Sequence, residues 1–131
     1  MSKKNFVADY QINASKKIIY PYLTTASGLQ EWFADEVRID EDKNFIFYFD
    51  QEDHYARQTI LKANVHIRWD FFDQKDVTKS TDSVIDFILV ETELTNSLYL
   101  RVIDQSNFYE FDELEGIWEG LITSLKQIIG G

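Results

Sequence analysis

Apolar residues recur at helical spacing in the last stretch of the chain, residues 111–129. The recurring positions, three or four residues apart, are Leu114, Ile117, Trp118, Leu121, Leu125 and Ile128. This spacing places them on one face of an α-helix. Asp112 stands where a helix N-cap is expected, and Glu115 can complete a capping box with it. Gly130 and Gly131 follow the pattern. The chain is therefore predicted to end in one long amphipathic helix.

Most of the chain before this helix alternates between apolar and polar residues, as half-buried β-strands do. The first predicted strand covers residues 5–13, and the residues on its apolar face are Phe6, Ala8, Tyr10 and Ile12. Six further strands are predicted at residues 36–40, 44–50, 55–62, 65–71, 84–91 and 98–102. Short polar turns join most of them, and a longer polar loop covers residues 73–82. This order favours an antiparallel meander.

Two short helices are predicted between the first and second strands. Ser15 is a good N-cap for a helix that begins at Lys16. Pro21 lies inside this helix, where it removes a backbone hydrogen bond and crowds the preceding turn. We therefore expect the helix to kink or to end early. A break at residues 24–28 precedes a second helical turn at residues 29–35.

The predicted elements assemble into one α+β domain that covers residues 1–131. A curved antiparallel sheet wrapped around the long C-terminal helix satisfies their order, with the two short helices after the first strand. A chain of 131 residues is long enough for one domain with a sizeable core. Its aromatic residues, 10 Phe, 7 Tyr and 3 Trp, indicate that large rings fill the interior or line a pocket within it.

The charge balance argues against two classes of partner. The chain has 13 Lys and Arg against 23 Asp and Glu, and this net charge of −10 repels phosphate backbones and anionic lipid headgroups. No stretch approaches the roughly 20 apolar residues of a membrane span. We therefore expect neither nucleic-acid binding nor membrane insertion. The absence of cysteine removes disulfides and thiolate chemistry. The first residues lack an apolar signal-peptide core, so a cytoplasmic location is expected.

Seven segments resemble, in this order, the helix-grip proteins of the START-like, or SRPBCC, superfamily. They are INAS, KKIIYPYLT, GLQEWFADEV, VHIRWDF, VIDFILVE, TNSLYLRV and GIWEGLITSLKQII, and together they span nearly the whole chain. Within the superfamily, the chain is most similar to the family related to the activator of the heat-shock-protein-90 ATPase, and to small START-like proteins of the Bacteroidetes. The resemblance implies the helix-grip fold, also called Bet v 1-like. It also implies that an apolar or amphipathic small molecule is held between the sheet and the long helix.

The resemblance directs attention to large residues on apolar faces as the walls of a ligand pocket. The candidates are Trp32, Phe33, Phe47, Trp69, Phe87 and Trp118, together with Gly120. The same rings can equally fill a close-packed core, because protein interiors leave little empty space. Gly116, Gly120 and Thr123 or Ser124 form a line of small residues along the predicted helix. Glycine costs about 1 kcal/mol relative to alanine in a helix interior. The line therefore indicates either the close approach of a strand or space left for a ligand.

Few residues point to catalysis or metal binding. His54 lies in a predicted polar turn and His66 on the polar face of its strand, and neither belongs to a spacing typical of metal ligands. Three aspartates on polar strand faces are expected to be solvated: Asp9, Asp70 and Asp86. The chain shows no nucleophile elbow and no phosphate-binding loop. We therefore assign no catalytic residue, metal or cofactor. Polar groups that can point inward are Tyr10, Tyr20, Tyr48, Tyr99 and Arg101, and nothing selects one of them.

Three functions fit these observations. The one we favour is a non-catalytic binding module for a hydrophobic or amphipathic molecule, such as a lipid or an aromatic metabolite. The second is a protein-interaction or co-chaperone-like role, or a homodimer contact, for which Ile88 and Val90 are the candidate apolar patch. The third is a small cyclase-like enzyme, which requires an acid, a base or a tyrosine inside a closed pocket. All three rest mainly on analogy at the level of the fold.

Overall fold

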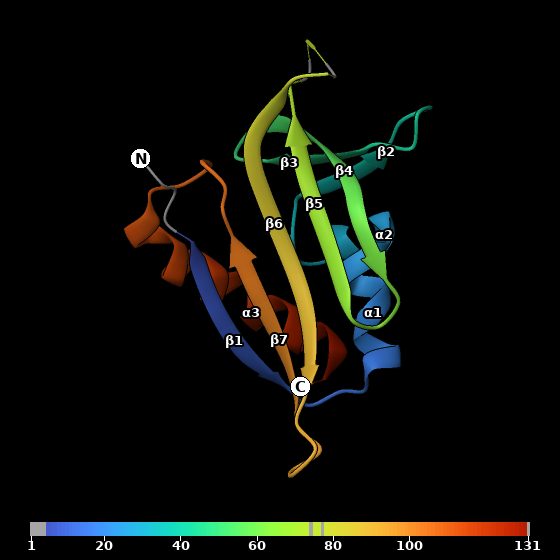
Figure 1. Cartoon of the computed structure of the whole chain (residues 1–131), viewed down its shortest axis with the longest axis vertical. Helices are drawn as coiled ribbons and strands as arrows, with labels where there is room; N and C mark the ends of the chain where they lie inside the picture. The colour runs from blue at the N-terminus through green and yellow to red at the C-terminus, as the bar shows by residue number, and fades with distance from the viewer. Residues whose placement is uncertain (1–4, 74, 77, 131) are drawn as a thin grey trace.

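The structure, a computed structural model, describes residues 5–73, 75–76 and 78–130. This part of the chain forms seven strands: β1 (Phe6–Ile12), β2 (Glu36–Ile39), β3 (Phe45–Phe49), β4 (Glu52–Lys62), β5 (His66–Phe72), β6 (Ser80–Glu91) and β7 (Leu98–Asp104). They pair in the order β1-β7-β6-β5-β4-β3-β2, and every pair is antiparallel. The first strand thus joins the last one, and β2 to β7 form the predicted meander. Figure 1 shows the long helix crossing behind β7 and β6.

The long C-terminal helix is confirmed as α3 (Leu114–Ile129), with its apolar face turned slightly from the predicted one. Its buried residues are Leu114, Trp118, Ile122 and Leu125. Ile128, which the pattern places on the apolar face, is 38% exposed, and Ile129 packs on the core instead. The predicted cap is also wrong. A short 3₁₀ helix, η1 (Phe111–Glu113), precedes α3, and the Glu110 N–H donates to Glu113 Oε1 across 3.1 Å.

Two short helices, α1 (Lys16–Thr24) and α2 (Ala26–Gln30), follow β1 as predicted. The Ser15 side chain caps α1 by accepting from the Ile18 N–H. The break between the helices is a single residue, Thr25, which caps α2 by accepting from the Gly28 N–H across 3.0 Å. Gly28 is required by packing, because a Cβ added there would lie 2.2 Å from the carbonyl oxygen of Pro21. The second helix therefore begins earlier than the hydrophobic pattern indicates.

The β3–β4 turn is tighter than the sequence suggests. Asp50 and Gln51 both have positive φ angles, +53° and +63°, as a two-residue type I′ hairpin requires. Strand β4 therefore begins at Glu52. His54, which the sequence places in a polar turn, is a strand residue opposite Phe47. At the other predicted loop, β6 begins at Ser80, which shortens that loop; its residues 74 and 77 lie outside the described part of the chain.

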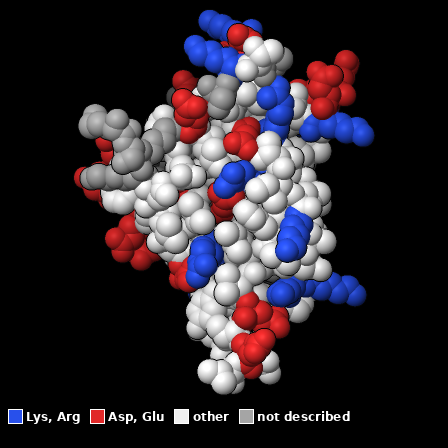
Figure 2. Space-filling model, viewed as in Figure 1, with Lys and Arg blue, Asp and Glu red and all other residues white. Residues whose placement is uncertain are grey.

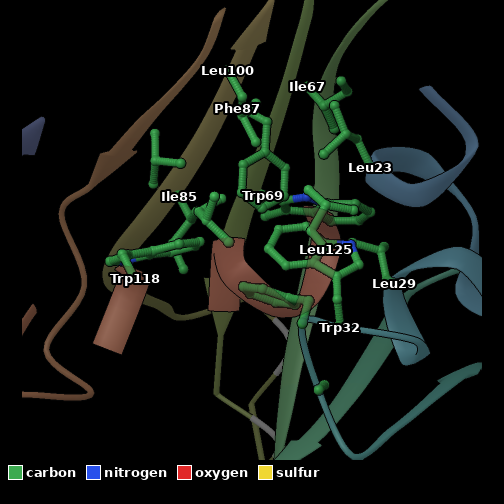
Figure 3. Close-up of a cluster of buried hydrophobic side chains, with 14 of the residues drawn as sticks. Leu23, Leu29, Trp32, Ile67, Trp69, Ile85, Phe87, Leu100, Trp118 and Leu125 are labelled. Atoms are coloured by element: carbon green, nitrogen blue, oxygen red, sulfur yellow. The ribbon is translucent and has the colours of Figure 1, made fainter. Parts of the chain in front are cut away.

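The core lies between the inner face of the sheet and the helices (Figure 3). Trp69 of β5 and Phe87 of β6 are completely buried, and Trp118 and Leu125 of α3 pack over the same face. Trp32, in the turn after α2, closes the cluster from the side of the short helices. Burial of side chains of this size contributes about 1.5–3 kcal/mol each. The core thus holds α3 and the α2–β2 turn against the sheet, and these are the elements that form the site.

Candidate functional site

A cleft of about 500 Å³ lies where α3, the α2–β2 turn and one end of the sheet meet. Six aromatic side chains line it: Trp32, Phe33, Phe49, Phe108, Tyr109 and Trp118. The lining also includes three aliphatic side chains, Ile85, Ile117 and Leu121. Ser124 of α3 lies at the edge of the cleft. The cleft is within the range of about 300–1,000 Å³ typical of small-molecule sites. The interior behind this cleft is filled by buried rings, and the cleft itself lies at one end of the sheet.

Two tryptophans of the cleft are fixed by hydrogen bonds. The Trp32 indole N–H donates to the backbone carbonyl of Tyr22 in α1, and the Trp118 N–H donates to Asp104 Oδ2, each across 2.8 Å. Asp104 ends β7 and is only 3% exposed, and its other oxygen accepts from the Ser106 N–H. The two indoles therefore cannot turn freely, and the cleft presents preformed aromatic walls.

Four carboxylates also line the cleft: Glu31, Asp35, Asp50 and Asp104. No Lys, Arg or His is among its lining residues in the part of the chain that the structure describes. Tyr109 also lines the cleft and is half-buried. Its burial, followed by the nearby charge of Asp50 and a hydrogen bond to that side chain, raises the pKa of the Tyr109 phenol to about 12. Tyr109 is therefore a neutral hydrogen-bond donor at physiological pH.

The predicted wall residues divide into two layers. Trp32, Phe33 and Trp118 line the cleft, and the Phe33 ring stacks on Trp118 at a centroid distance of 5.9 Å. Phe47, Trp69 and Phe87 do not line it. They are completely buried behind the first layer, with Phe87 5.8 Å from Phe33 and Phe47 5.2 Å from both Phe33 and Trp69. Three of the six predicted rings thus line the cleft, and the other three belong to the core that supports them.

Gly120 is not part of the cleft, which corrects the interpretation of the small-residue line. Gly116 and Gly120 lie on the exposed face of α3, and a Cβ added to either would meet no atom within 4 Å. Neither the approach of a strand nor space for a ligand explains them. Ser124, the next small residue along the helix, does line the cleft.

The lining residues that the hydrophobic pattern does not identify include Phe49, Asp104, Phe108 and Tyr109. Phe49 is a strand residue whose face is ambiguous, because β3 is apolar throughout. Phe108 and Tyr109 lie between β7 and η1, where no periodicity applies. Asp104 looks like the polar end of a strand. The available signal is the aromatic run from Phe108 to Phe111 immediately before the long helix.

Both histidines are less exposed to solvent than their sequence context suggests. His54 is half-buried, stacked on Phe49 at 3.9 Å and packed edge-on against Phe108 at 4.8 Å. Burial lowers the pKa of the His54 imidazole below 6.5, so it is neutral at physiological pH. It also lines a smaller cavity of about 190 Å³ on the far side of Phe108. His54 therefore supports the aromatic wall from behind.

The outer sheet face carries one buried carboxylate. Asp86 is 1% exposed and accepts from His66 Nε2 at 2.6 Å and from Arg68 Nε at 2.9 Å, which corrects the expectation that it is solvated. Asp9, by contrast, is exposed and pairs with Arg101. Within residues 5–73, 75–76 and 78–130, no three His, Cys, Asp or Glu side chains are grouped so as to hold a metal ion.

The candidate interaction patch, Ile88 and Val90, lies on this outer face and is half-buried. Figure 2 views this face: acidic and basic groups are scattered between neutral side chains, without a single-sign field. Among the described helices, none combines the length and apolar character needed to cross a membrane.

Comparisons with known proteins agree with this architecture. The Aha1 dimer from Colwellia psychrerythraea is 23% identical, with a TM-score of 0.73 over 96% of each chain. A Mesorhizobium loti protein is 16% identical, with a TM-score of 0.74 over 97% of each chain. A Bacteroides fragilis protein is 28% identical, with a TM-score of 0.62 over 98% of this chain and 92% of that one. No curated protein sequence matches the chain.

The sequence model of the START-like superfamily domain matches residues 1–131. With the seven-stranded antiparallel sheet and the long C-terminal helix of the described residues, this match establishes the α+β helix-grip fold. The chain belongs to the START-like superfamily.

Proposed function

We propose that the protein binds a small apolar or amphipathic molecule in the cleft between α3, the α2–β2 turn and the sheet, without transforming it. The observation that carries the proposal is the size and lining of the cleft. It offers about 500 Å³ and six aromatic side chains. A molecule that covers the half-buried rings of Phe49, Phe108 and Tyr109 gains roughly 25 cal/mol for each Å² of apolar surface removed from water. The other three rings are already buried and support these.

The rigidity of the walls supports binding. Trp32 and Trp118 are each held by a hydrogen bond of 2.8 Å, and Phe33 is packed between them and the second layer. A wall that is already ordered loses little side-chain entropy when a ligand arrives. The phenol of Tyr109 keeps its proton at neutral pH and is hydrogen-bonded to Asp50, which fixes this ring as well.

The proposal is tested with protein purified without detergent. Native mass spectrometry identifies any co-purified molecule, and a thermal-shift screen covers fatty acids, sterols, aromatic acids and aromatic amines. A ligand that binds only the folded state raises the melting temperature with concentration. A protein that retains no molecule and shows no shift with any of these classes contradicts the proposal.

A matched pair of variants locates the binding. Ser124→Trp places a large ring at the edge of the cleft and should abolish the shift. Thr123→Trp places the same ring on the next residue of α3, which does not line the cleft. Both residues are exposed, and both hydroxyls donate to the carbonyl four residues earlier. Loss of binding in both variants, or in neither, argues against this cleft as the site.

Self-association through the outer sheet face is the second candidate function. The observation that favours it is the row of half-buried apolar residues on that face, which includes Val84, Ile88, Val90 and Ile103. One structural neighbour is described as a dimer. Sedimentation of the protein over a wide concentration range, with Ile88→Asp as the disrupting variant, decides the question. A monomer at all concentrations removes this candidate.

A further inference from the structure

We propose that the ligand of the cleft is a cation, an amine or quaternary ammonium attached to an apolar or aromatic body. This inference rests on the binding function proposed above and adds the sign of the ligand's charge. It follows from the distribution of charge and aromatic rings around the cleft.

The charged side chains of the lining are all acidic. Three of them are exposed at its edge: Glu31, Asp35 and Asp50. Asp104 is buried and accepts a hydrogen bond from the Trp118 indole N–H. None of these four carboxylates takes part in a salt bridge between described residues. Asp104 is instead satisfied by two neutral N–H donors. The negative charge of the cleft is therefore not neutralised by the protein.

Tyr109 lies within the field of these carboxylates, and burial is the largest cause of its raised pKa. The charges of Asp50, Asp104 and Asp35 act in the same direction as burial and also raise this pKa. The same three carboxylates thus make an added negative charge unfavourable in the cleft. A ligand that carried a carboxylate or phosphate to this position would meet the same repulsion, and no lining cation would offset it.

The aromatic walls are suited to a cation for a second reason. A ring attracts a cation to its face, most strongly in the case of Trp. The rings that the cleft leaves partly exposed are Phe49, Phe108 and Tyr109. Behind them, Trp32, Phe33 and Trp118 are at most 7% exposed and pack against one another. An ammonium group near these rings can also lie within the field of Asp104 or Asp50. Aromatic faces and carboxylates together are the chemistry that recognises an ammonium group.

The test uses three probes with the same naphthalene body: 2-(2-naphthyl)ethylamine, 2-(2-naphthyl)ethanol and 2-naphthylacetate. Isothermal titration calorimetry at low salt gives the affinity of each. We expect the amine to bind at least about tenfold more tightly than the alcohol, and the acetate to bind most weakly. Added salt should weaken only the amine, because exposed charges are screened.

Charge variants separate the carboxylates of the cleft from the net charge of the protein. Asp35→Asn and Asp50→Asn change exposed residues, so the fold should be kept, and each should weaken the amine about three- to tenfold while leaving the alcohol unchanged. Glu93→Gln removes the same charge from the exposed β6–β7 turn and is the control, with no expected effect.

Each outcome bears on one of the two proposals. If the alcohol or the acetate binds as tightly as the amine, the cation inference is wrong while the binding function stands. If amine binding survives Ser124→Trp, or falls equally with Glu93→Gln, the amine is attracted to an acidic surface and the inference is overturned. If none of the three probes binds, the cation inference is overturned, and the binding function is then decided by the thermal-shift screen with fatty acids and sterols.

Discussion

The hydrogen bond between the Trp118 indole and the Asp104 carboxylate joins α3 to the end of β7, and its contribution can be measured by a double-mutant cycle. The donor and acceptor are 2.8 Å apart, and the two residues are only 2% and 3% exposed. Trp118→Phe keeps an aromatic ring and removes the donor. Asp104→Leu removes the acceptor at similar volume. The double variant closes the cycle.

The expected magnitudes follow from burial. A hydrogen bond to an ionised group contributes about 1.5–3 kcal/mol, and the coupling energy between Trp118 and Asp104 should fall in that range. Trp118→Phe alone should lower the free energy of unfolding by about 2–4 kcal/mol, because it also leaves the buried carboxylate with one donor fewer. Trp118→Ala, which empties the site, should cost about 3–5 kcal/mol.

Urea denaturation followed by far-UV circular dichroism gives these free energies, provided that the slope of each transition is unchanged. The loss of the Ser106 N–H partner occurs in both variants that lack Asp104, so it cancels from the coupling energy. A coupling energy below about 0.5 kcal/mol would refute the view that this bond holds the helix to the sheet.

Three further predictions concern single residues. Gly28→Ala should destabilise the protein by more than about 2 kcal/mol in thermal or urea unfolding, because its Cβ would lie 2.2 Å from the Pro21 carbonyl; an unchanged stability would mean that the α1–α2 packing is wrong. Gly120→Ala should instead stabilise by up to about 1 kcal/mol, since the added methyl group meets open space on a helix; destabilisation would contradict this placement. The free energy of unfolding should decline as the pH falls below 6.5, because His54 takes up a proton more readily in the unfolded chain than in the folded protein, where its pKa is lowered. His54→Phe should flatten this part of the pH profile. An identical profile in the variant would count against the burial of the His54 ring.

Elements with clear periodicity can be predicted from this sequence, and those defined by packing cannot. The strand at residues 65–71 and the helix at 111–129 have many apolar positions at one period, so both appear as expected. The start of α2 depends on the Thr25 cap and on the contact of Gly28 with Pro21, which no periodicity records. The phase of α3 at its end is not fixed by the pattern, because Ile128 and Ile129 are both apolar; in the structure Ile129 packs on the core and Ile128 is exposed.

The candidate site was predictable only in part, for a similar physical reason. A buried ring leaves the same pattern in the sequence whether it borders a cleft or fills the interior, so Trp118 and Trp69 looked alike. Phe108 and Tyr109 belong to an irregular segment, and their position depends on where η1 turns the chain towards α3. The acidic lining arises from residues that are far apart in the chain, Asp35 and Asp104 among them. The negative electrostatic field that these carboxylates produce in the cleft arises only when the fold brings them together, so the sequence pattern does not reveal it.

The three tryptophans allow the most direct test of ligand binding at this cleft. Trp32 and Trp118 line it, while Trp69 is buried away from it and serves as an internal control. Their indole N–H signals in a ¹⁵N–¹H correlation spectrum can be assigned with single Trp→Phe variants and followed during titration with 2-(2-naphthyl)ethylamine. Binding in this cleft should give saturable shifts of the Trp32 and Trp118 signals and leave the Trp69 signal unmoved. Shifts of Trp69 alone, or no shift of any indole at saturating probe, would contradict it.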